Sequence, residues 1–95
     1  MTLAIVSTIV LKANSYHPIK KALKSMDSII KNEYGCLKFE VHEYGESCPV
    51  IVTLEVWKNK DQLRKYLKSD SFFSIKKCLS PHVEDISFKA LDCEL

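Results

Sequence analysis

Residues 36–57, CLKFEVHEYGESCPVIVTLEVW, contain two runs with the residue pattern of paired β-strands. In the first run, residues 36–44, polar side chains alternate with the apolar side chains of Leu37, Phe39 and Val41. The second run, residues 50–57, is rich in β-branched residues. The segment between them, GESCP (45–49), carries a glycine and a proline and has the length of a hairpin turn. This stretch therefore predicts two antiparallel strands that are neighbours in a sheet.

The flanking sequence adds one strand and one helix before the hairpin, and a helical region and one strand after it. We expect a strand over residues 3–12, a helix over 17–33, a helix over 59–69 with one or two further helical turns before Pro81, and a strand over 82–91. Asn59 is the expected cap of the second helix, and the chain breaks at Ser69-Asp70 before the further turns. Right-handed crossovers in this order predict a ferredoxin-like βαββαβ α+β fold, with four antiparallel strands and the helices on one face. We expect a single domain over residues 1–95, with its core between residues 3 and 92.

The strand at residues 50–57 has two faces of different character. Every second residue from Val50 to Val56 is apolar, and we expect this set to lie under the helices. The other set is mixed, and we expect it to border a cavity or a partner subunit: Ile51, Thr53, Glu55 and Trp57. Both faces of the first strand are apolar as well, so the helix-free face is too apolar to meet water. We therefore expect a homodimer packed sheet to sheet about a two-fold axis.

The net charge of the chain is small. Fourteen basic and twelve acidic residues give +2, which is too little to attract nucleic acid or a membrane surface strongly. The apolar runs VIVTLEV and LAIVSTIVL have about half the length that spans a bilayer. The start MTLAIVSTIV shows neither a basic leader nor a small-residue cleavage site, so we expect no signal peptide. These features predict a cytoplasmic protein with no nucleic-acid or membrane partner.

The cysteines do not form a metal-binding pattern. Cys36, Cys48, Cys78 and Cys93 are separated by 12, 30 and 15 positions, and no CxxC pair occurs. We expect reduced thiols, with Cys36 as a small buried apolar residue. No metal or flavin motif is visible, so we expect no metal site and no cofactor.

With these elements in place, the chain resembles the antibiotic biosynthesis monooxygenase family of dimeric α+β barrels. The resemblance covers nearly the whole chain and rests on three ordered motifs: Gly35-Cys36 at a strand start, Glu55-x-Trp57 at a strand end, and Ser69-x-x-Phe72 at a helix entry. It implies a dimer and, in one branch, cofactor-independent oxygenation of quinol- or anthrone-like aromatics. The wider family often carries a histidine just before the phenylalanine, where this chain has Ser71, so an obvious proton carrier is missing.

The haem-degrading branch of this family fits the chain less well. Its pocket asparagine falls on Ser7, and its pocket histidine falls on the segment Lys76–Cys78. The expected axial ligand of haem iron is therefore absent, and we do not expect haem degradation.

Three residues are candidates for proton transfer: His42, Glu55 and Tyr66. Each needs to reach a substrate proton, and a buried carboxyl such as Glu55 gains base strength from a raised pKa. The expected walls of a substrate pocket between the sheet and the second helical region are Trp57, Ser7, Ile9, Thr53, Phe72 and Phe73. Each residue also fits a purely structural role: Trp57 packing on a phenylalanine, Glu55 pairing with a cation, and His42 lying on the surface.

Two functions remain open at this point. The first is a small monooxygenase that binds an electron-rich aromatic substrate and stabilises its anion. The second is a non-catalytic dimer that binds a small apolar or anionic ligand, and the missing pocket histidine favours it. The sequence alone leaves open whether the protein is an enzyme.

Overall fold

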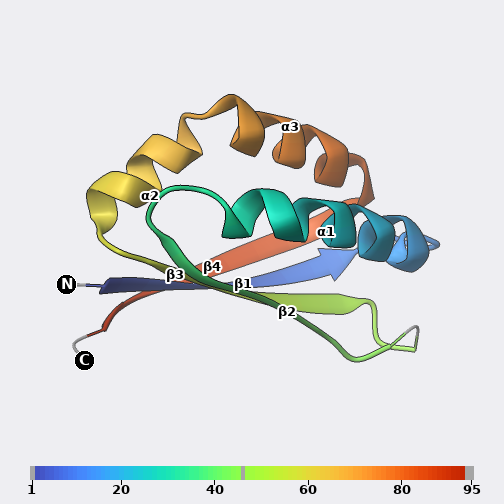
Figure 1. Cartoon of the computed structure of the whole chain (residues 1–95). Helices are drawn as coiled ribbons and strands as arrows, with labels where there is room; N and C mark the ends of the chain where they lie inside the picture. Colours follow the sequence, from blue (N-terminus) through green and yellow to red (C-terminus); the bar gives the residue numbers. More distant parts are fainter. Residues whose placement is uncertain (1, 46, 94–95) are drawn as a thin grey trace.

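The hairpin predicted at residues 36–57 lies at one edge of a four-stranded antiparallel sheet (Figure 1). The computed structural model describes residues 2–45 and 47–93, so Glu46 in the turn lies outside the described residues. Strand β2 (Cys36–Glu43) pairs with β3 (Val50–Trp57), β3 with β1 (Thr2–Leu11), and β1 with β4 (Val83–Cys93), in the order β2-β3-β1-β4. The helices α1 (Tyr16–Lys31), α2 (Lys60–Leu67) and α3 (Asp70–Leu79) all lie on one side of the sheet (Figure 1). The ferredoxin-like fold is therefore confirmed.

Serine and asparagine side chains define how the second helical region begins and bends. Asn59 caps α2 as predicted, with its Oδ1 accepting a hydrogen bond from the backbone N–H of Gln62 at 2.9 Å. Ser69 ends α2 and starts α3, because its Oγ donates to the carbonyl of Tyr66 (2.6 Å) and accepts from the backbone N–H of Phe72 (3.2 Å). The region is thus two helices with a fixed bend, and a 3₁₀ turn (Ser80–His82) then leads into β4.

The prediction of which face of β3 lies under the helices is wrong. Ile51, Thr53 and Trp57 are buried on the helix side, where they join a core that includes Ile19, Leu23, Met26 and Ile30 of α1 and Tyr66 of α2. The residues Val50, Val52, Leu54 and Val56 are only half-buried, on the opposite face. The large side chains of Trp57 and Ile51 fill the deep space beneath the helices. The volume of these side chains, and not the uniformly apolar character of the other set, therefore decided which face of β3 the helices cover. The polar Thr53 and Glu55 are carried to the same side by the two-residue period of the strand.

A bulge at Leu37 interrupts the alternation predicted for β2. Cys36 pairs with Trp57, whereas Lys38 already pairs with the next residue along β3, Val56. The extra residue leaves the side chain of Leu37 58% exposed, although Phe39 and Val41 pack in or against the core as predicted. Leu67 is likewise exposed, at 46%, and is the last residue of α2.

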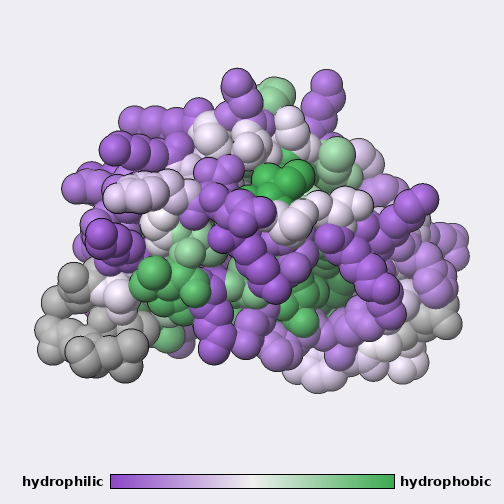
Figure 2. Space-filling model, in the orientation of Figure 1, coloured by the Kyte–Doolittle hydropathy of each residue, from purple (hydrophilic) through white to green (hydrophobic). Residues whose placement is uncertain are grey.

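The face of the sheet without helices is apolar in its centre. Half-buried side chains of β1 and β3 form this centre, and charged side chains lie on the edge strands β2 and β4. Seen from the side, with the helices above the sheet, hydrophilic side chains cover most of the surface and hydrophobic ones show in separate groups (Figure 2). No helix within the described residues is long and apolar enough to cross a membrane.

Candidate functional site

The end of β3 brings together an aromatic stack and a half-buried carboxyl group. The indole ring of Trp57 is fully buried and stacks on the ring of Tyr66, with the ring centres 4.8 Å apart and the planes at 27°. The ring of Phe72 meets Tyr66 edge to face at 5.3 Å. Trp57 Nε1 donates a hydrogen bond to Glu55 Oε1 at 3.1 Å. Two residues spaced by two along one strand thus present a polar pair beneath α2.

Burial controls the protonation of this cluster. Burial raises the pKa of the Glu55 carboxyl, and the hydrogen bond from Trp57 only partly offsets the effect. Burial, and then the negative charge of Glu55, raises the pKa of the Tyr66 hydroxyl well above its ordinary value. Burial likewise raises the pKa of the Cys36 thiol. Tyr66 and Cys36 therefore stay protonated at neutral pH, and Glu55 is the group of the cluster whose charge changes most readily.

Two hydroxyl groups extend this polar strip across the sheet. Ser7 on β1 and Thr53 on β3 are directly opposite each other and are 3% and 5% exposed. Neither side chain hydrogen-bonds to another described residue, which is unusual for buried hydroxyls. Among the described residues, every fully enclosed side-chain nitrogen or oxygen has a hydrogen-bond partner. Since the hydroxyl oxygens of Ser7 and Thr53 have none, both must keep a small accessible area. The strip Ser7–Thr53–Glu55 therefore offers free polar groups on an otherwise apolar surface.

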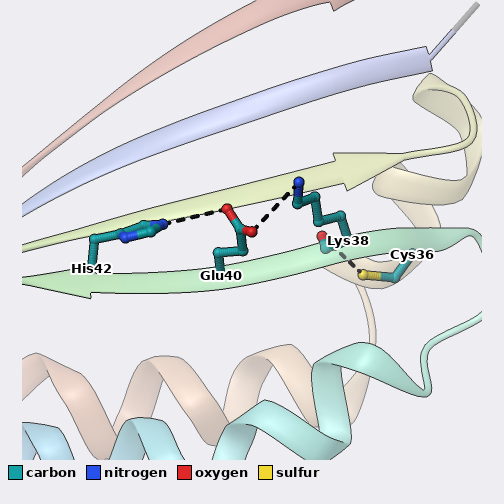
Figure 3. A network of polar contacts seen from close by, with 4 residues as sticks. All are labelled: Cys36, Lys38, Glu40 and His42. Carbon is teal, nitrogen blue, oxygen red and sulfur yellow. Dashed lines mark hydrogen bonds and ion pairs between the residues drawn. The ribbon is translucent and has the colours of Figure 1, made fainter.

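The structure gathers most of the predicted site residues and separates two of them. Ile9 is buried in the core close to Thr53, and Phe72 packs against the core, whereas Phe73 is 67% exposed and points away. His42 lies on the helix-free face of β2, where its Nε2 is 3.3 Å from Oε1 of Glu40 (Figure 3). His42 and Glu55 thus occupy opposite faces of the sheet.

The remaining histidines also lie away from Glu55. His17 is exposed at the start of α1, and the ring of His82 is hydrogen-bonded to Ser15 Oγ at 3.2 Å. Since His42 lies on the other face, no histidine of the chain reaches the cluster. Among the predicted proton-transfer residues, Glu55 and Tyr66 are therefore the two in this cluster, and the Glu55 carboxyl is the one that could act as a base.

Cys36 and Glu33 also belong to the surroundings of this site, although the sequence did not indicate them. Cys36 is opposite Trp57 in the strand register, and the charge of Glu33 acts on both Cys36 and Tyr66. Gly35-Cys36 and Glu55-x-Trp57 are separate motifs in the sequence, and their pairing on adjacent strands would have been visible only from the register.

Two surface hollows lie outside the cluster, along α1 and β2. One has a volume of about 450 Å³ and is lined by residues that include Lys31, Cys36 and Phe39; the other, of about 340 Å³, is lined by residues that include Leu23, Lys24 and Val41. Neither touches Trp57, Glu55 or Tyr66. Within the described residues, no group of three or more His, Cys, Asp or Glu side chains could hold a metal ion. Cys36, Cys48 and Cys78 are free thiols, and the side chain of Cys93 lies outside the described part.

The family model for antibiotic biosynthesis monooxygenase matches residues 11–77, which include Glu55, Trp57 and Tyr66. The chain belongs to this family. The match confirms the resemblance drawn from the three sequence motifs. A comparison with curated proteins gave no match.

Solved structures show the same monooxygenase-family fold. A candidate antibiotic biosynthesis monooxygenase from Caulobacter crescentus superposes with a TM-score of 0.90 at 20% identity, covering 99% of this chain and 91% of that one. A conserved protein from Methanosarcina mazei gives a TM-score of 0.88 at 21% identity, over 99% and 94% of the two chains. A candidate monooxygenase from Deinococcus radiodurans gives 0.84 at 18% identity, over 100% and 94%. At these identities the likeness establishes the fold of this family member and leaves its substrate open.

Proposed function

We propose that this family member is a cofactor-independent monooxygenase that oxidises an electron-rich aromatic substrate, such as an anthrone or a quinol, between the sheet and the second helical region. The observation that carries the proposal is the half-buried Glu55, hydrogen-bonded to Trp57 and continued across the sheet by the buried hydroxyls of Thr53 and Ser7, which have no hydrogen-bond partner among the described residues. The raised pKa of Glu55 makes its carboxylate a stronger base. The two hydroxyls are suitable donors for a developing oxyanion.

The chemistry balances without a redox group from the protein. For an anthrone, the Glu55 carboxylate removes a proton from the ring CH₂ carbon, and the resulting anion passes an electron to dioxygen from solution. Recombination forms a C–O bond and gives a peroxide anion, which takes the proton back from Glu55 to become a hydroperoxide. The Glu55 carboxylate then removes the second proton from the same carbon while the O–O bond breaks. The departing hydroxide takes up that proton as water, and the carbon is left as a C=O group. The CH₂ carbon is oxidised, dioxygen is reduced, and the products are the quinone and one water.

We also propose that the protein works as a homodimer in the cytoplasm, with the helix-free faces of two sheets in contact. The apolar centre of that face, formed by residues such as Val6, Leu54 and Val56, supports this arrangement. The free thiols of Cys36, Cys48 and Cys78 fit a reducing compartment.

A second function has specific support. No histidine lies in the cluster, and both Glu55 and Tyr66 have raised pKa values, so the site is closer to a neutral binding surface than to an acid–base pair. The same residues would then bind a flat apolar ligand without converting it to a product.

Oxygen consumption with a panel of anthrones and quinols separates the two functions. A monooxygenase consumes one dioxygen per substrate, and Glu55→Gln should lower kcat at least about 100-fold, the scale of a lost general base. The matched control is Glu84→Gln, which removes an exposed carboxylate at the start of β4 and should leave kcat unchanged. Quenching of Trp57 fluorescence by a panel member without any oxygen uptake would establish the binding function instead.

A further inference from the structure

One row of side chains crosses the helix-free face with opposite charges at its two ends. The strand register places Glu40 of β2 beside Leu54 of β3, Leu54 beside Val6 of β1, and Val6 beside Lys89 of β4. The centre of the row is apolar, and its ends lie on the two edge strands. We propose that a second copy of this chain covers this face with its two-fold axis parallel to the strands, so that Glu40 of each copy forms an ion pair with Lys89 of the other. The proposal deepens the sheet-to-sheet dimer proposed above and rests on it.

Symmetry limits how two such faces can stack. With the axis parallel to the strands, every residue keeps its level along the strand, and β2 of one copy lies over β4 of the other. Glu40 then lies opposite Lys89 twice in the dimer. With the axis across the strands at this level, Glu40 would lie opposite Glu40 and Lys89 opposite Lys89, which like-charge repulsion disfavours. The charges of this row therefore favour the first arrangement.

The neighbouring rows agree with this arrangement. Lys38 shares its row with Leu91, and His42 shares its row with Ser87, so neither basic side chain of β2 would face a cation of β4. Stacked sheets lie about 10 Å apart, a gap that glutamate and lysine side chains span together.

Within one copy, the two end charges differ in their partners. Glu40 is flanked on its own strand by Lys38, with 3.4 Å between Nζ and Oε2, and by His42 (Figure 3). These contacts are exposed and hold the carboxylate pointing away from the helices. They also lower the pKa of Glu40, chiefly through the hydrogen bond with His42, so that it is ionised at neutral pH. Lys89 forms no ion pair with any other described residue.

Charge reversal at both ends of the row tests the pairing. Glu40→Lys and Lys89→Glu should each raise the dimer dissociation constant about tenfold or more in low salt, because each puts like charges opposite twice per dimer. The double variant, which swaps the charges, should return to within about threefold of wild type. Equimolar mixing of the two single variants should yield the mixed dimer in preference to either homodimer, as native mass spectrometry would show. Sedimentation at micromolar concentrations gives the constants.

Asp61→Lys on the exposed surface of α2 makes the same change in charge as Glu40→Lys and should leave the dissociation constant unchanged. Circular dichroism of each variant confirms that it is folded. The pairing is overturned, and the dimer kept, if neither charge reversal changes the dissociation constant. The same holds if the double variant does not recover the dissociation constant of the wild type. A monomeric wild type overturns the pairing and the dimer together, and would assign this face to another partner. Oxygen consumption tests the monooxygenase proposal independently of all these results.

Discussion

The indole N–H of Trp57 donates to the carboxyl group of Glu55 at 3.1 Å, so the fully buried tryptophan is also the polar partner of a half-buried acid on the same strand. An indole supplies one donor and no acceptor. It therefore stabilises the carboxylate form of Glu55 while burial disfavours it, and the balance of the two leaves the pKa of Glu55 raised.

Trp57→Phe removes this donor and part of the buried area. Leaving the carboxyl without its partner should cost about 1–3 kcal/mol of unfolding free energy, measured by urea denaturation. The pKa of Glu55 should rise further, because only the burial effect remains. If unfolding of the variant matches wild type across the pH range, the hydrogen bond does not contribute as described.

Glu40 on β2 and Glu55 on β3 should give opposite pH dependences. Burial raises the folded-state pKa of Glu55 above its unfolded value, so its protonated form stabilises the fold at low pH, and that stability is lost as pH rises through the folded pKa. Glu55→Gln keeps an acceptor for Trp57 and should therefore gain stability relative to wild type as the pH is raised from acid to neutral.

Glu40 is the matched opposite case. Its folded-state pKa is lowered, first by the hydrogen bond with His42, so its contribution is present above the unfolded pKa and is lost as pH falls. Glu40→Gln should thus lose stability relative to wild type toward neutral pH, by a small amount because the contact is exposed. Equal pH slopes for the two variants in thermal unfolding would contradict the placement of Glu55.

Gly35 is required where β2 begins against α2. Its φ is +88°, and a Cβ at this position would lie 2.6 Å from Cβ of Gln62. Gly45, in the hairpin turn, has a similar φ of +94° but open space around it. Gly45→Ala should cost about 1 kcal/mol from backbone strain alone, and Gly35→Ala about 2–4 kcal/mol, since the strand start must move. Comparing the two variants by chemical denaturation isolates the effect of the contact with Gln62. Equal losses of unfolding free energy would show that the Gln62 side chain moves aside at no cost.

Ser69 ties α2 to α3, and this bend sets the position of Tyr66 and Phe72. Ser69→Ala removes the N-cap hydrogen bond that the Phe72 N–H donates and the hydrogen bond to the Tyr66 carbonyl. The free energy of unfolding should fall by about 1–2 kcal/mol. Ser74→Ala, at an exposed position inside α3, is the control and should be neutral or slightly stabilising, because alanine favours helices. Thermal unfolding of both variants makes the comparison.

The element order, the caps and the family were predictable because they depend on short-range patterns. Asn59 and Ser69 precede helices for local reasons, and Gly35 stands where only a positive φ fits. Trp57 was expected to pack on a phenylalanine, but it stacks on Tyr66, which in turn meets Phe72. The placement of His42 did not follow, since whether it shares a face with Glu55 depends on how β2 is aligned with β3. The bulge at Leu37 shifts that alignment.

The sequence by itself determined which segments become strands and helices, because each segment carries its own periodicity, caps and turn residues. Only the tertiary structure decided which face of β3 the helices cover. Both faces are apolar enough to be buried, and the choice was made by the volume of Trp57 and Ile51 filling the space under α1 and α2. That choice placed Glu55, Thr53 and Ser7 inside, and left Glu40, Leu54 and Lys89 on the open face.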